Sequence, residues 1–173
     1  MIKLPQLKHA ALSISLAFQA GCTGAGTDTE SDSDTDINRV SSISSDLVSL
    51  PEIRSSMNNK CLDLLGFNPS NGAPVGMWDC AGGANQHWSW NGEEIRSSMN
   101  NKCLDILGFN SNNGAPVVVW DCVGGANQHW YRDGLQIKSR FNNKCLDLLG
   151  FNNSNGAHVG MWDCAGGANQ QWY

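Results

Sequence analysis

The segment 53-IRSSMNNKCLD-63 occurs three times in this chain of 173 residues, again as 95-IRSSMNNKCLD-105 and, slightly altered, as 137-IKSRFNNKCLD-147. The spacing is 42 residues both times, with no insertion, and over the first 36 positions the first copy matches each of the others at 30. Each copy continues with L-G-F-N, V-x-x-W-D-C and G-G-A-N-Q-x-W in the same order. Self-similarity at a fixed period indicates a repeat architecture, and it divides the chain into repeats 53–94, 95–136 and 137–173.

Short β-strands are predicted in every copy. In the first copy, residues 61–65, 75–80 and 86–90 are rich in Leu, β-branched or aromatic residues and are separated by Gly, Asn, Ser and Pro clusters. Hairpin-turn signals lie between the copies, at Asn91-Gly92 and Asp133-Gly134. Because no helical period follows residue 50, we expect an all-β fold of about twelve short strands. The units form either an open array or a closed threefold ring, and closure is favoured because neither end carries a polar cap.

The three co-spaced motifs C-L-D, W-D-C and N-Q-x-W, present in every copy, carry a family resemblance. Over residues 50–173 the chain resembles the ricin-type β-trefoil lectins, the Q-x-W carbohydrate-binding family. The resemblance implies a β-trefoil domain that binds glycans without catalysis and needs no cofactor.

Six cysteines fall into pairs 19 residues apart, and the pairs recur every 42 residues. Fifteen pairings of six cysteines are possible, and an exported chain can oxidise them. Repeat symmetry, together with the bridge that the resembled family has inside each repeat, favours Cys61–Cys80, Cys103–Cys122 and Cys145–Cys164. The closely spaced cysteine pairs of a zinc site are absent from the sequence, so no metal is expected.

The first cysteine pair also predicts a register. If Cys61 and Cys80 are direct partners in an antiparallel pair, paired residue numbers sum to 141 and Asp63 lies opposite Trp78. Leu62 and Leu64 then point to the other face, into the core. The same geometry is expected in the other two repeats.

A carboxylate can accept hydrogen bonds from neighbouring sugar hydroxyls, an amide can donate and accept, and an indole can stack on the apolar face of a pyranose. In the resembled family an aspartate, an aromatic residue and an asparagine before Q-x-W hold the sugar. The corresponding sites are Asp63, Trp78, Asn85 and Gln86; Asp105, Trp120, Asn127 and Gln128; and Asp147, Trp162, Asn169 and Gln170. Many ricin-type sites carry Gln two residues before the aromatic, where this chain has Gly76, Val118 and Gly160, so both galactose-type sugars and other pyranosides remain candidate ligands.

Each of these residues also has a structural interpretation. The tryptophans of Q-x-W, namely Trp88, Trp130 and Trp172, are expected in the core. Gln86 either contacts ligand or satisfies the backbone and the aspartate from inside. Trp78 is either a sugar platform or another core residue, and Asp63 is either a ligand contact or a turn cap.

Binding is favoured over catalysis. Glu93 and Glu94 are the only adjacent carboxylates after residue 50, and neighbours in a strand face opposite sides. We therefore expect a monomeric lectin whose three sites act together on multivalent glycans. The alternatives are a β-trefoil that binds a protein partner and the binding subunit of a polysaccharide-degrading system. From residue 51 onward 10 acidic residues face 8 basic ones, a balance that excludes a basic nucleic-acid surface.

The N-terminal third of the chain is expected to direct export. Residues 1–21 combine two lysines, a nine-residue apolar run and small residues, as in a signal peptide. Ala20-Gly21-Cys22 resembles a bacterial lipobox, so Cys22 is the candidate lipidated first residue of a cell-surface or outer-membrane lipoprotein, and simple secretion is the competing interpretation. Residues 22–49, rich in Ser, Thr and Asp, are predicted to form a flexible acidic linker.

Overall fold

The computed structural model describes residues 51–173, so the predicted signal peptide, Cys22 and the predicted linker lie outside the described residues. The described chain is built from strands and 3-10 turns, and no helix in it is long and apolar enough to cross a membrane. The strands are β1 (Cys61–Leu64), β2 (Ala73–Trp78), β3 (Trp88–Asn91), β4 (Glu94–Ser97), β5 (Cys103–Ile106), β6 (Ala115–Trp120), β7 (Trp130–Asp133), β8 (Gln136–Ser139), β9 (Cys145–Leu148) and β10 (Ala157–Trp162). The 3-10 turns are η1 (Leu65–Phe67), η2 (Ala84–Gln86), η3 (Leu107–Phe109), η4 (Ala126–Gln128), η5 (Leu149–Phe151) and η6 (Ala168–Gln170).

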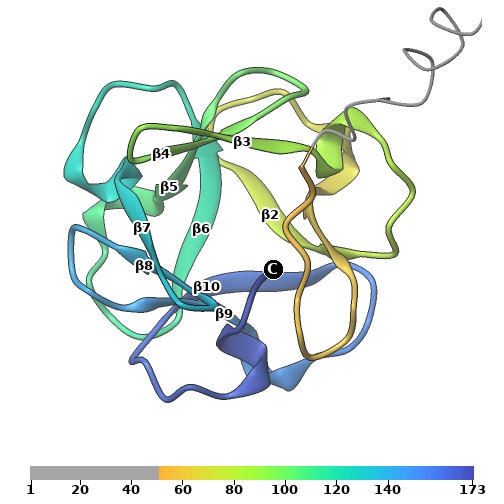
Figure 1. Cartoon of the computed structure of the whole chain (residues 1–173). Coiled ribbons are helices and arrows are strands. Elements are labelled where there is room, and N and C mark those ends of the chain that lie inside the picture. The colour runs from red at the N-terminus through yellow and green to blue at the C-terminus, as the bar shows by residue number, and fades with distance from the viewer. Residues whose placement is uncertain (1–50) are drawn as a thin grey trace, which may run out of the picture. The chain divides into compact units, whose positions relative to one another are not determined.

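The three repeats close around a pseudo-threefold axis. Within each repeat one antiparallel pair forms, β1 with β2, β5 with β6, and β9 with β10. The longer strands β2, β6 and β10 then pair with one another, each with the other two, and lie around the centre of the view in Figure 1. This closed arrangement is the predicted β-trefoil.

The hairpins β3–β4 and β7–β8 join consecutive repeats, and the equivalent third junction joins the third repeat to the first. There, Ser55 forms an isolated bridge with Trp172, and the backbones of Arg54 and Tyr173 exchange hydrogen bonds of 2.9 and 3.0 Å. The structure therefore has ten strands within residues 51–173, where about twelve were expected. At the third junction, around Ser55 and Trp172, the pairing consists of isolated bridges and is too short to count as two further strands.

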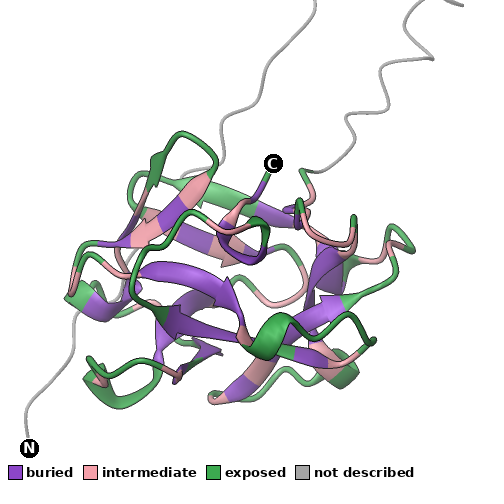
Figure 2. Ribbon diagram, turned by 90° about the horizontal axis from the view of Figure 1, so that it is seen from below, coloured by how far each residue is buried: buried purple, intermediate pink, exposed green. Residues whose placement is uncertain are grey.

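The core is assembled from equivalent residues of the three repeats, and buried positions gather along the strands while exposed ones lie in the outer loops (Figure 2). Leu62 and Leu64 are fully buried, as expected for the inward face of β1. Trp88 is also buried, and its indole Nε1 donates a 2.8 Å hydrogen bond to the carbonyl oxygen of Leu62. Trp130 and Trp172 make the same bond to Leu104 and Leu146, so the prediction that these tryptophans belong to the core is confirmed.

The three disulfides form as predicted, but the register inferred from them was wrong. Cys61 lies opposite Trp78, and Asp63 lies opposite Gly76, so paired numbers sum to 139. Cys80 lies two residues beyond the end of β2, and the bridge ties β1 to the loop that follows β2, with a Cα–Cα distance of 5.1 Å. Because the shift is two residues, Asp63 and Trp78 still share one face of the pair, as diagonal neighbours.

Candidate functional site

A buried carboxylate forms the base of each candidate site. In the first repeat, Asp63 in the middle of β1 is 3% exposed, and its Oδ2 accepts hydrogen bonds from Asn85 Nδ2 and Gln86 Nε2, both at 2.8 Å. Within residues 51–173, the second oxygen, Oδ1, accepts no hydrogen bond. The turn η2 carries both amides, and both donate to the same oxygen of Asp63.

Gln86 is committed to internal contacts. Its Oε1 accepts hydrogen bonds from the backbone N–H groups of Ala81 (2.7 Å) and Gly82 (3.2 Å). Its Nε2 also donates to the carbonyl oxygen of Asp79 at 2.9 Å. Gln86 therefore fastens the loop after β2 to the carboxylate of Asp63, next to the Cys61–Cys80 bridge. Gln170 makes the corresponding contacts in the third repeat. Gln128 makes them in the second repeat with one backbone donor, the N–H of Val123.

Two aromatic side chains form the walls of each site. The predicted platforms are exposed, Trp78 and Trp162 at 45% and Trp120 at 37%, and so are not core residues. Opposite them stand Phe67, Phe109 and Phe151, at 66%, 53% and 66% exposure. These phenylalanines have φ angles of 51°, 54° and 53°, a left-handed conformation that is uncommon for a bulky side chain and often marks a functional position.

The sequence analysis did not predict a role for these phenylalanines in the sites. The available signal was an aromatic residue recurring in all three L-G-F-N segments, between residues that favour turns. In the structure each one ends a 3-10 turn and projects its ring toward the site.

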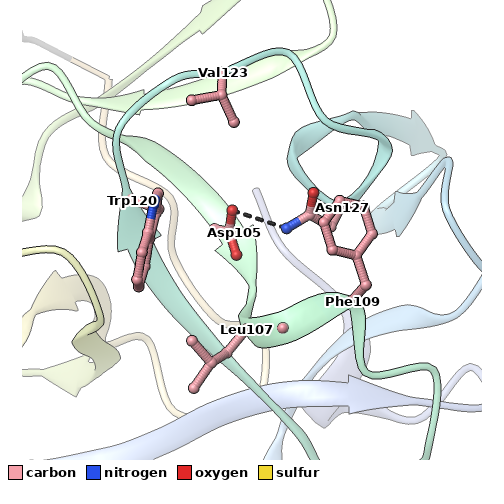
Figure 3. A pocket seen from close by; sticks show the side chains of 7 residues that line it. Asp105, Leu107, Phe109, Trp120, Val123 and Asn127 are labelled. Atoms are coloured by element: carbon pink, nitrogen blue, oxygen red, sulfur yellow. Dashed lines mark hydrogen bonds between the residues drawn. The ribbon is translucent and has the colours of Figure 1, made fainter.

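These residues enclose one cavity per repeat, with volumes of about 450 Å³ in the first, 250 Å³ in the second and 360 Å³ in the third. Figure 3 shows the second, in which Trp120 and Phe109 flank Asp105 and Asn127. The structure brings together the predicted aspartate, tryptophan and asparagine in all three repeats. The predicted glutamine lines the first and third cavities and lies behind the aspartate in the second.

The pKa values of two sets of aspartates are shifted in opposite directions. Burial raises the pKa of Asp63, Asp105 and Asp147, and the amide hydrogen bonds from the glutamine and asparagine offset part of that rise. The exposed carboxylates of Asp79, Asp121 and Asp163, which follow the platform tryptophans, have a lowered pKa because Lys60, Lys102 and Lys144 donate hydrogen bonds to them. The site carboxylates are therefore the ones that protonate first on acidification.

Each site is supported by a loop from another repeat. Asn155, in the third repeat, accepts hydrogen bonds at Oδ1 from Lys60 Nζ (2.7 Å) and the Asp79 N–H (3.0 Å), and donates from Nδ2 to Asp79 Oδ2 (2.8 Å). A Cβ added to the adjacent Gly156 would lie 3.8 Å from Cζ3 of Trp78, so this loop passes behind the platform. Asn71 supports the second site and Asn113 the third in the same way.

Within residues 51–173, the clusters of potential metal ligands are not available to bind a metal ion. Two groups of three potential ligands occur there, Glu52 with Cys61 and Cys80, and Glu94 with Cys103 and Cys122. In both groups the two cysteines are joined in a disulfide and cannot act as thiolates.

A carboxylate, an amide and exposed aromatic rings around one cavity are groups that can hydrogen-bond to sugar hydroxyls and stack on a pyranose ring. The comparison with family profiles agrees: the chain belongs to the ricin-type beta-trefoil lectin domain family, which matches residues 50–172. As a member of that family it is a carbohydrate-binding protein. A comparison with curated proteins finds no match.

Several solved structures share the fold. ThreeFoil, a designed 3-fold symmetric protein, is 29% identical with a TM-score of 0.67, covering 70% of this chain and 94% of that chain. The C-half of the earthworm R-type lectin, in complex with GalNAc, is 27% identical with a TM-score of 0.60, covering 71% and 97%. An exo-β-1,3-galactanase from Clostridium thermocellum is 26% identical with a TM-score of 0.66, covering 70% of this chain and 28% of that enzyme.

Proposed function

We propose that each of the three cavities binds one pyranose unit of a glycan. The observation that carries the proposal is the pairing, in every repeat, of a buried carboxylate with a free Oδ1 and an exposed indole in the same cavity. In the first site the sugar stacks on Trp78, and its hydroxyls donate to Asp63. Asn85 provides the adjacent amide, and Phe67 closes the opposite side. Gln86 positions Asp63 and the loop without touching the sugar, because its amide is already used internally.

The second site contains a further acceptor. Asn127 donates from Nδ2 to Asp105 Oδ2 (2.9 Å) and to the carbonyl oxygen of Ile106 (3.1 Å). Its Oδ1 is buried and has no hydrogen-bond partner among the described residues. An unpaired buried acceptor is costly, and no such atom occurs at Asn85 or Asn169 in the other two sites.

We infer that the chain acts as a multivalent lectin. Three cavities on one closed fold can engage several branches or repeats of the same glycan, which raises the overall affinity by about 10²–10⁴ where the geometry permits. Glycan-coated surfaces and repeating polysaccharides present such ligands, so adhesion or polysaccharide capture is the role that fits best.

Catalysis does not enter the proposal. Glu93 forms a 3.0 Å ion pair with Arg140, and Glu94 forms a 2.6 Å ion pair with Arg96. Both carboxylates are thus engaged by arginines outside the three cavities.

The galactanase neighbour supports the second candidate function, because this fold corresponds to only 28% of that enzyme. A binding module for a polysaccharide-degrading system is therefore the alternative to adhesion.

The compartment follows from the disulfides. Three bridges in a small domain are typical of an extracellular or otherwise oxidising environment. We propose that residues 1–21 direct export, that Cys22 is lipidated and that residues 22–49 separate a monomeric lectin domain from the membrane. Mass spectrometry of the mature N-terminus tests this proposal: a diacylglyceryl-modified Cys22 supports it, and an unmodified secreted chain supports simple secretion instead.

Glycan binding is tested with a triple site variant and a control on a glycan array. Asp63, Asp105 and Asp147 are changed to Asn in the site variant, and the exposed Asp133, whose carboxylate pairs with Lys138 away from the three cavities, is changed to Asn in the control. The first variant should lose glycan signal while its near-ultraviolet circular dichroism stays native, and the control should keep most of its signal. A site variant that binds glycans as the parent does would contradict the proposal, and an unchanged protein-partner profile would favour the protein-binding alternative.

A further inference from the structure

The second cavity differs from the other two in volume and in its apolar lining, although the three repeats are nearly identical in sequence. It is the smallest, and Leu107 and Val123 line it. Neither the equivalent leucines, Leu65 and Leu149, nor any valine lines the other cavities. Figure 3 shows Val123 above and Leu107 below the Asp105 carboxylate, between the two aromatic walls.

The position of Leu107 has a cause in the facing strand. A Cβ added to Gly76 would lie 2.8 Å from Leu65 Cδ1, and one added to Gly160 would lie 2.8 Å from Leu149 Cδ1. In the first and third repeats the leucine therefore fills the space beside a glycine. In the second repeat Val118 occupies that space, so Leu107 cannot take the same position. It is 38% exposed, and it forms part of the cavity wall.

Val123 narrows the cavity from the opposite side. It replaces the alanines at the equivalent positions and is 73% exposed, so its methyl groups face the entrance without support from the core. Together, Leu107, Phe109, Trp120 and Val123 surround Asp105 with apolar surface. The aspartate, asparagine and tryptophan are the same residue types as in the other sites, whereas the apolar wall is different.

We propose that the second site has a specificity of its own and selects pyranosides that carry a methyl group, as in an acetamido or a 6-deoxy substituent. This inference rests on the proposed sugar-binding function. Asp105 and Asn127 hold the ring as in the other sites, and the methyl group packs between Leu107 and Val123. Val118 is the specificity-determining residue behind the wall: it lies opposite Asp105 in the strand pair, is buried and displaces Leu107, and it does not itself line the cavity. A methyl group buried in this way should strengthen binding about fourfold or more.

The experiment isolates the sites in the full chain. Trp78→Ala with Trp162→Ala leaves the second site, and Trp120→Ala leaves the first and third. Each protein is titrated calorimetrically with the methyl glycosides of galactose, glucose and mannose, and with their 6-deoxy and 2-acetamido analogues. At the second site at least one methyl-bearing analogue should bind about fourfold more tightly than its parent sugar, and the first and third sites should show no such preference.

Two further variants connect the preference to the wall. In the protein that retains only the second site, Val118→Gly with Val123→Ala should abolish the preference, measured as the ratio of the affinities for the analogue and its parent sugar. Leu107→Ala should also reduce the preference, and it avoids placing a glycine in β6, so a folding defect of Val118→Gly does not decide the result. The reverse change at Gly76 is unsuitable, because an added Cβ would lie 2.6 Å from the carbonyl oxygen of Ala157.

The outcomes separate the two claims. Equal preferences at all three sites would overturn this inference and leave the lectin function intact. A preference at the second site that survives the Val118→Gly, Val123→Ala and Leu107→Ala changes would also overturn it. Failure of the unaltered protein to bind any of these sugars would count against the proposed function itself.

Discussion

Removing the Cys61–Cys80 bridge should weaken both the fold and one site. The bridge joins β1 to the loop whose N–H groups donate to Gln86. It therefore lowers the conformational entropy of the unfolded chain, and in the folded chain it holds this loop beside Asp63. The two cysteines are 19 residues apart, and the loop-entropy relation gives about 3 kcal/mol for a closed loop of this length. Changing both to alanine should therefore lower the free energy of unfolding by about 3–4 kcal/mol, since Cys61 is fully buried and leaves a small cavity.

Urea denaturation measures the loss of stability, and calorimetric titration with a bound sugar measures the effect on the site. Binding should fall at the first site alone, because the other two sites keep their own bridges. The matched control removes Cys103–Cys122, which should cost a similar free energy and weaken the second site. A stability loss below about 1 kcal/mol, or an equal loss of binding at all three sites, would refute the reasoning.

Three further predictions follow from the same contacts. Acidification should weaken sugar binding at a pH above 3.8, because Asp63 and its counterparts have a raised pKa and become protonated there. The fold should persist at that pH, because the ion pairs of Asp79 and its counterparts are lost only as the pH falls through their lowered pKa, below 3.8. Binding and circular dichroism measured along one pH series check both expectations. Asn155→Ala should weaken the first site several-fold although Asn155 belongs to the third repeat, and nuclear magnetic resonance titration should find the other two sites unchanged. Trp88→Ala should lower the free energy of unfolding by about 3–5 kcal/mol, measured by urea denaturation, because it empties a fully buried position and leaves the Leu62 carbonyl without its donor.

The sequence alone predicted the features that depend on period and composition. The spacing of 42 residues predicted three equivalent units, and the absence of polar caps favoured their closure. Repeat symmetry and the family resemblance together predicted the three bridges. The tryptophans of Q-x-W are buried as expected. For Trp78 the sequence left a platform and a core position open, and the structure shows that it is exposed.

The features that depend on three-dimensional detail were not predicted. A cysteine spacing does not reveal whether both cysteines lie in strands, and Cys80 lies in a loop, so the register was displaced by two residues. The support of Trp78 by the Asn155 loop arises from closure, which brings together residues 76 or more positions apart. The contribution of Phe67 depends on a left-handed backbone angle, which side-chain preferences make improbable.

A crystal structure of the chain with a bound monosaccharide tests the central claim most directly. We predict a pyranose ring stacked on Trp78, Trp120 or Trp162, with a hydroxyl oxygen within about 2.5–3.0 Å of the aspartate Oδ1 at the base of the same cavity. A sugar bound away from these cavities, for example on the hairpin surface that carries Trp90 and Arg132, would contradict the account.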